Sequence, residues 1–321
     1  MRTNFVDVMR GIGICLVVIG HLGNTTSSVI NFLYVFHVPL FFFISGFLQT
    51  NKNFYSIDFH TFAGNLIFHL LIPYMAFSLF SYLIFIMKPL NYFDVGNFLS
   101  SILVGNVYSL YFNQVLWFFP CLICAKLFFW TGCKLLGVKA SSLFFLFLGI
   151  LIVSLNELFD FKNIFSISSS IVALVFFIGG VLVRGRKDYL EIILKENTFF
   201  YMILLSIVIV VSIYNGRVDL AGLEFGSWPF YFLGAFSGVI LTLKVSNFLS
   251  GSKFLSYLGQ STIYIFPLHP LFFSLFNGIG VYVFSQPIGF QNSLITSVCY
   301  FFMSIYLSIF FGKIIDKMVK L

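Results

Sequence analysis

The sequence predicts an all-α, polytopic membrane protein of about ten transmembrane helices with both termini in the cytoplasm. Hydrophobic residues make up 60% of the 321 residues, and 47 residues are phenylalanine. Only 9% are charged, whereas a soluble domain carries about 25%. Apolar runs close to the ~20 residues that cross a bilayer recur along the whole chain. We therefore expect a single transmembrane domain over residues 1–321 and exclude a water-soluble globule.

Ten apolar segments are long enough to be interpreted as spans. They are 6–23, 32–50, 62–87, 115–133, 141–156, 166–183, 198–214, 228–249, 257–277 and 292–312. A further segment, 98–112, is short and is interrupted by Gly105, Asn106 and Asn113. We expect it to form an interfacial or re-entrant helix at the outer face, where protein or water must satisfy its backbone.

The basic residues indicate the orientation, because cytoplasmic loops of membrane proteins carry an excess of lysine and arginine. With ten spans and a cytoplasmic N-terminus, only Lys88, Lys162 and Arg217 fall on the outer side. Counting 98–112 as a span would place most basic loops outside. The net charge of +7 is therefore expected to face the inner side of a lipid bilayer, and it does not indicate a nucleic-acid partner.

The first segment carries Arg10 and His21, and an ionisable residue within a span is a functional candidate because its burial in lipid is costly. The two residues are eleven positions apart, so their side chains project from nearly one face of a helix, about 16 Å apart along its axis. Asp7 lies one turn before Arg10 and can pair with it. Gly11 and Gly13 allow a neighbour to approach closely. Alternatively, Arg10 snorkels and His21 lies at the interface.

The second segment is expected to begin near His37 on the outer side, at the depth of His21. Two histidines at one depth can serve as a base and as a donor that orients a substrate. They can also form a metal pair, although no third ligand of zinc type lies nearby in the sequence. We predict no metal site.

Three other groups remain open from the sequence. Lys126 lies in a helix among aromatic residues, where it pairs with a carboxylate, faces a cavity or snorkels. His269 lies between Pro267 and Pro270, which must distort the helix, and it either lines a cavity or is a packed, hydrogen-bonded histidine. The acidic residues of the outer loops are solvated or hold an incoming sugar by its hydroxyls; they are Glu157, Asp160, Asp219 and Glu224.

The string DVMRGI at 7–12, His21, and HVPLFFFISGF at 37–47 together resemble the integral-membrane acyltransferase 3 family, which includes polysaccharide O-acetyltransferases. Further landmarks resemble the family in the same order. They are LIPY at 71–74, LWFFP at 116–120, FFIGG at 176–180, WPFYFLG at 228–234, and LGQSTIY at 258–264 with LHP at 268–270. The resemblance covers essentially the whole chain.

The resemblance implies a bacterial inner-membrane enzyme that moves an acetyl group from acetyl-CoA to a sugar hydroxyl of a cell-surface polysaccharide or lipid-linked precursor. Acetyl-CoA is then a substrate, and no bound cofactor is expected. His21 matches the catalytic histidine of the family and Arg10 its partner arginine, with Asp7 beside it. The residues expected to line the cavity are His37, Ser45, Trp117 and His269, with Ser45 and Trp117 as candidate donors to the oxyanion.

The chain departs from the family in the third segment. Many members carry an Arg-x-x-Arg pair before the Pro-Tyr of this span, whereas this chain has LIFHL at 66–70. If that pair binds the phosphates of the donor, the candidates to replace it are His69, Arg184, Arg186 and Lys187. The last three can equally form an ordinary positive-inside anchor. The departure leaves open a different acyl donor or acceptor, a catalytically silent member, and a transporter or flippase of a lipid-linked glycan or small anion.

Overall fold

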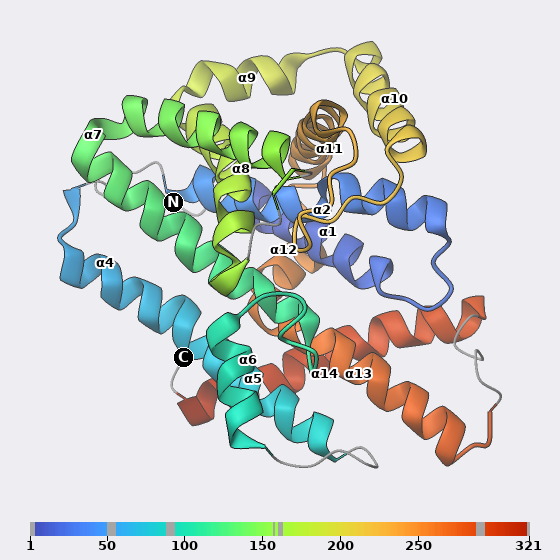
Figure 1. Cartoon of the computed structure of the whole chain (residues 1–321). Coiled ribbons are helices and arrows are strands. Elements are labelled where there is room, and N and C mark those ends of the chain that lie inside the picture. Colours follow the sequence, from blue (N-terminus) through green and yellow to red (C-terminus); the bar gives the residue numbers. More distant parts are fainter. Residues whose placement is uncertain are drawn as a thin grey trace.

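Helices make up nearly all of the structure (Figure 1), a computed structural model that describes residues 4–49, 56–87, 94–156, 158–159, 163–286 and 293–319. The helices are α1 Asn4–Gly20, α2 Ser27–Leu48, α4 Phe59–Leu66, η1 Ile67–Leu71, α5 Ile72–Ile86, α6 Val95–Val104, η2 Gln114–Trp117, α7 Phe118–Leu155, η3 Ile164–Ser166, α8 Ile167–Gly185, α9 Lys187–Lys195, α10 Thr198–Tyr214, α11 Trp228–Phe248, α12 Lys253–Gln260, α13 Thr262–Tyr282 and α14 Leu294–Val319. Strand-like pairing in the described ranges is limited to an isolated bridge between Asp219 and Glu224. The all-α prediction is confirmed. Four loop residues considered above lie outside the described residues: Lys88, Glu157, Asp160 and Lys162.

Seven helical segments of the described chain are long and apolar enough to cross a membrane, and a bent pair adds an eighth if it is counted as one span. The seven are Ser27–Leu48, Phe59–Ile86, Gln114–Leu155, Ile164–Gly185, Trp228–Phe248, Thr262–Tyr282 and Leu294–Met318, and the bent pair is Asp188–Lys195 with Thr198–Tyr214. Helix α1 has 17 residues, or about 25 Å, less than the ~30 Å hydrocarbon core. The multi-pass character is established, while ten spans and cytoplasmic termini remain predictions.

Helix α7 accounts for part of the difference between the ten predicted spans and the seven or eight candidate spans of the structure. The segments predicted at 115–133 and 141–156 are continuous in α7, but Gly137 has non-helical angles of φ 78° and ψ 163°, a conformation that glycine adopts readily. The chain turns back at this point (Figure 1). A side chain at Gly132 would press against Ser141 and Phe145, so the two arms of α7 pack against each other.

Three predicted boundaries differ from the structure. Helix α2 begins at Ser27 behind the N-cap Thr26, so His37 lies in the middle of the helix and does not begin it. The segment predicted as 257–277 is divided at Ser261 into α12 and α13. Helix α6 has ten residues and ends at Gly105 with a φ of 52°, so it is too short to span, as predicted for 98–112.

Glycine contacts bring the helices of the core together at backbone distance. Helix α1 packs on α12, where a side chain on Gly11 would collide with the carbonyl oxygen of Leu255, and one on Gly259 with that of Asp7. Helix α2 crosses α8 in the same manner at Gly46 and Gly180. Because these contacts exclude any Cβ atom, they fix α1 and α2 against the rest of the bundle.

Candidate active site

Two cavities lie along α1, one beside Arg10 within the helix and one beside His21 just after its last residue. The Arg10 cavity has a volume of about 290 Å³ and is lined by Arg10, Phe41, Ile44, Ser45, Leu48, Gln49, Leu70, Phe118, Phe119, Leu122, Lys126, Gly259, Gln260, Thr262, Ile263 and Phe266. The His21 cavity has a volume of about 90 Å³ and is lined by Val17, His21, Tyr34, His37, Val38, Val107, Gln114, Val115, Trp117, Arg217, Val218, Asp219, Leu220, Ala221 and Phe266. Phe266 is the one lining residue that the two cavities share among the described residues.

The Arg10 cavity is positively charged. Arg10 and Lys126 line it, whereas none of the described residues that line it is an aspartate or a glutamate. The charge of Arg10 acts on Lys126, so the two cations are close enough to interact. Two cations in one partly enclosed space favour an anionic ligand. The sequence left the environment of Lys126 open, and in the structure this residue lines a cavity.

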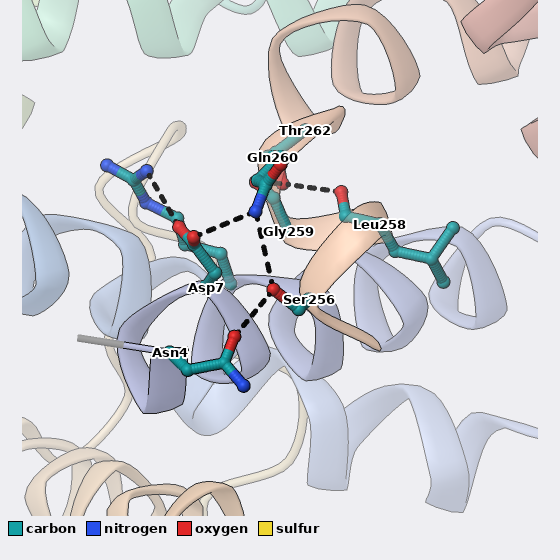
Figure 2. A network of polar contacts seen from close by, with 8 residues as sticks. Asn4, Asp7, Ser256, Leu258, Gly259, Gln260 and Thr262 are labelled. Carbon is teal, nitrogen blue, oxygen red and sulfur yellow. Dashed lines mark hydrogen bonds and ion pairs between the residues drawn. The ribbon is translucent and has the colours of Figure 1, made fainter. Parts of the chain in front are cut away.

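Arg10 is oriented by a polar network that joins α1 to α12 (Figure 2). One of its nitrogens lies 3.8 Å from Oδ1 of Asp7, a residue that is almost fully buried. The amide of Gln260 donates to Oδ2 of Asp7 at 3.1 Å and to the hydroxyl of Ser256 at 3.4 Å. That hydroxyl donates to Asn4 at 2.9 Å. The predicted pairing of Asp7 with Arg10 is confirmed. The sequence did not predict that α12 takes part in this network.

Hydrogen bonds determine the tautomers of the histidines at the other end of α1. His21 Nδ1 lies 2.8 Å from the carbonyl oxygen of Val17, and His37 Nδ1 lies 2.7 Å from that of Leu33. Because a carbonyl oxygen only accepts, each Nδ1 carries the proton, and each Nε2 of the neutral ring presents a lone pair. Both rings can therefore accept a proton at Nε2. His37 can serve as the donor that the sequence suggested only when its ring is protonated at Nε2 as well.

His269 packs directly against His21, with ring centroids 5.0 Å apart at an interplanar angle of 72°. Its Nδ1 lies 3.0 Å and 2.9 Å from the carbonyl oxygens of Ile265 and Phe266. The side chain is fully buried, and its Nε2 has no hydrogen-bond partner in the described structure. His269 thus lies behind His21 and supports its ring, and it is not among the residues that line the His21 cavity.

Three phenylalanine rings pack together at the residue that the two cavities share. The centroid of Phe266 lies 5.1 Å from that of Phe118 and 6.4 Å from that of Phe41. Phe41 and Phe118 are 6.1 Å apart. We call these three residues the aromatic partition. Phe41 and Phe118 line the Arg10 cavity alone, and Phe266 lines both cavities, so the three rings form an apolar wall of the Arg10 cavity that the His21 cavity shares at Phe266.

The match to a family model decides the identity of the chain. The model described as an acyltransferase domain, that of the acyltransferase 3 family, matches residues 3–313. The chain belongs to the acyltransferase 3 family. No curated protein and no solved structure matches the chain. With its apolar helices, the family identifies a membrane acyltransferase.

The two candidate oxyanion donors of this acyltransferase lie in different cavities. Ser45 lines the Arg10 cavity and Trp117 lines the His21 cavity. Because Trp117 is largely buried, its indole N–H is shielded from water. Only Trp117 therefore shares a cavity with His21.

Three of the four predicted substitutes for the Arg-x-x-Arg pair, His69, Arg184 and Arg186, do not line the Arg10 cavity. His69 is exposed on η1, although its neighbour Leu70 lines the cavity. Arg184 and Arg186 are exposed and lie over the rings of Phe47 and Tyr189, at 5.2 Å and 5.1 Å. Lys187 is the first residue of α9. Lys126 is the cation that lines the cavity with Arg10.

The sequence indicated that Asp219, in the loop between α10 and α11, is solvated or holds an incoming sugar, but it did not connect this loop with the histidines. Arg217 and Asp219 nevertheless line the His21 cavity, and one nitrogen of Arg217 lies 3.9 Å from Oδ2 of Asp219. Burial raises the pKa of Asp219, an effect that the nearby Arg217 charge and the backbone amide of Ala221 partly oppose. A carboxyl group with a perturbed pKa that lines a cavity is a candidate for a binding position.

Proposed function

We propose that the protein is an O-acyltransferase of the bacterial inner membrane that transfers an acetyl group from acetyl-CoA to a sugar hydroxyl of a cell-surface polysaccharide or its lipid-linked precursor. The observation that carries this proposal is the pair of cavities that share Phe266, one cationic and one lined by histidines. A two-sided site of this kind suits a reaction whose anionic donor and neutral acceptor arrive from opposite sides.

The donor binds in the Arg10 cavity. Arg10 and Lys126 attract its phosphate groups, since charge-assisted hydrogen bonds to phosphate are among the stronger ones. The acyl end then points toward the aromatic partition, where apolar rings accept a methyl group and exclude water. With a cytoplasmic N-terminus, this cavity opens toward the compartment that supplies acetyl-CoA, and the His21 cavity opens toward the opposite side.

His21 acts as the general base. Its Nε2 accepts the proton of the acceptor hydroxyl while the hydroxyl oxygen attacks the carbonyl carbon of the thioester. The bond between carbon and sulfur then breaks, and the imidazolium returns the proton to the departing thiolate. The products are an acetyl ester and CoA with a free thiol. Trp117 donates its indole N–H to the oxyanion of the tetrahedral intermediate.

The test is mass spectrometry of surface glycan from cells with the wild-type protein, cells without it, and cells with His21→Ala. We expect a mass increase of one acetyl group with wild type that is absent in the other two. The control is His60→Ala, because His60 is exposed on α4 and lies outside both cavities.

The same experiment distinguishes the competing functions. A glycan of normal amount and unchanged mass in wild-type cells would exclude glycan acetylation. Loss of the entire glycan in cells without the protein would indicate a carrier for a lipid-linked glycan. Normal acetylation with His21→Ala at wild-type abundance would show that His21 is not the base.

A further inference from the structure

The loop between α10 and α11 brings a matched pair of charges to the His21 cavity. Among the described residues that line this cavity, Arg217 and Asp219 are the two that belong to the lysine, arginine, aspartate and glutamate types. The guanidinium carbon of Arg217 lies 4.8 Å from the ring centroid of Tyr34, and its charge also acts on His21. The pair therefore faces the space next to the proposed base.

The loop is held rigidly from behind. The hydroxyl of Ser169 donates to the carbonyl oxygen of Leu220 at 2.9 Å, and the amide of Asn163 donates to that of Ala221 at 3.2 Å. Val218 is fully buried. Because these contacts fix the backbone on both sides of Asp219, its carboxylate is a positioned group and not a mobile surface charge.

The carboxylate and the guanidinium are not hydrogen-bonded to each other, so a ligand beside them can bind both. Oδ1 of Asp219 accepts a hydrogen bond from the backbone N–H of Ala221 at 2.9 Å. Oδ2 lies 3.9 Å from Arg217, which is too long for a hydrogen bond. The side chains are 24% and 57% exposed for Asp219 and Arg217, so both can be reached. A hydroxyl group beside the pair could donate to Oδ2 and accept from the guanidinium at the same time.

The charges of the pair also indicate what kind of molecule binds. Since Arg217 and Asp219 balance each other, the cavity favours a neutral ligand that is rich in hydroxyls over an anion. A cavity of about 90 Å³ has room for roughly six to nine waters at about 10–15 Å³ each, which suits one sugar unit and not several.

We propose that Asp219 and Arg217 form the acceptor subsite and bind a neutral sugar unit by adjacent hydroxyls, so that another hydroxyl of the same ring faces His21. The inference rests on the proposed function and deepens it, because it assigns the residues that select the acceptor. Both residues are positioning residues for the transfer.

The experiment measures transfer by the purified full-length protein in lipid vesicles, from acetyl-CoA to unacetylated glycan extracted from cells that lack the protein. We expect Asp219→Asn and Arg217→Gln each to raise the KM for the glycan at least tenfold while the KM for acetyl-CoA stays within twofold of wild type. Asn at this position keeps the oxygen that accepts from Ala221. Glu224→Gln is the matched control, because Glu224 is an exposed carboxylate of the same loop and does not line the cavity.

Several outcomes would overturn the inference. An unchanged KM for the glycan in both variants removes the subsite. An equal rise of both KM values, or an equal effect of Glu224→Gln, assigns the loop a purely structural role. The wild-type measurement stands apart: if the wild type consumes no acetyl-CoA in the presence of the glycan, the proposed function itself fails, and the subsite fails with it.

Discussion

The ring of His21 is held by a hydrogen bond at Nδ1. A substitution can therefore remove the acceptor at Nε2 and still keep that hydrogen bond. Asparagine at position 21 can still donate to the carbonyl oxygen of Val17 but has no lone-pair nitrogen at the position of Nε2. We expect His21→Asn to lower kcat roughly 10²- to 10⁴-fold, the usual contribution of a general base. The measurement is the initial rate of acetyl transfer at equal protein abundance.

His37→Asn is the comparison, since His37 forms the equivalent bond to Leu33 and lines the same cavity. We expect a smaller loss from this variant. If His37→Asn were inactive and His21→Asn fully active, the base would be His37.

Lys126 offers a second test at the scale of a single side chain. We expect Lys126→Met to raise the KM for acetyl-CoA about tenfold, because a hydrogen bond to a charged group contributes about 1.5–3 kcal/mol. Methionine keeps much of the length of the side chain without its charge. Lys139→Met is the control, since Lys139 is an exposed residue of the same helix. A KM equal to that of the control would place the phosphates of the donor elsewhere.

The junction of α1 and α12 shows how one element determines the geometry of the site. Gly259 lies against the backbone of Asp7, and the next residue, Gln260, donates to the carboxylate of Asp7. Any side chain at Gly259 must push the two helices apart. This movement would release the carboxylate that orients Arg10.

We therefore expect Gly259→Ala to lower the free energy of unfolding by about 1–3 kcal/mol, the usual cost of overpacking, and to raise the KM for acetyl-CoA. The thermal midpoint in detergent measures the first effect, and initial rates measure the second. In Gly64→Ala the new methyl group meets open space, so this control should be neutral or slightly more stable, because alanine favours a helix. Equal midpoints for the two variants would contradict the close contact.

At the scale of the whole molecule, the apolar runs predicted most helices, because a run of about 20 apolar residues has few alternatives to a helix in a membrane. The boundaries were harder to predict. Nothing in the composition shows that Ser27–Asn31 continues α2, which places His37 within that helix. Gly137 turns α7 back through its φ and ψ angles, and many other glycines in the chain remain helical.

The part of the candidate site that lies within one segment could be predicted from the sequence. The part formed where distant segments meet could not. Asp7, Arg10 and His21 lie within one segment, so their spacing alone indicates a shared face. Arg217 and Asp219 belong to an irregular loop. Its sequence has no hydrophobic periodicity from which their position at the His21 cavity could be predicted. Phe266 is one of 47 phenylalanines, and only the fold distinguishes it as the residue that lines both cavities.

The aromatic partition leads to a prediction about the molecule as a whole. If Phe266 keeps the donor cavity separate from the acceptor cavity, a smaller side chain should let water reach the thioester when no acceptor is bound. We expect Phe266→Leu to raise the hydrolysis of acetyl-CoA without acceptor severalfold relative to transfer. Leucine keeps an apolar contact, so the fold is less at risk than with alanine, which would remove a large buried side chain at a cost of about 3–5 kcal/mol.

The ratio of free acetate to acetylated glycan measures this effect, and it is independent of the amount of protein. Phe284→Leu is the control, because Phe284 is 66% exposed and lines neither cavity. A ratio equal to wild type, together with normal transfer, would mean that Phe266 does not separate the cavities during turnover. A raised ratio would show that both cavities belong to one reaction path, which is the feature that a separate donor site and acceptor site require.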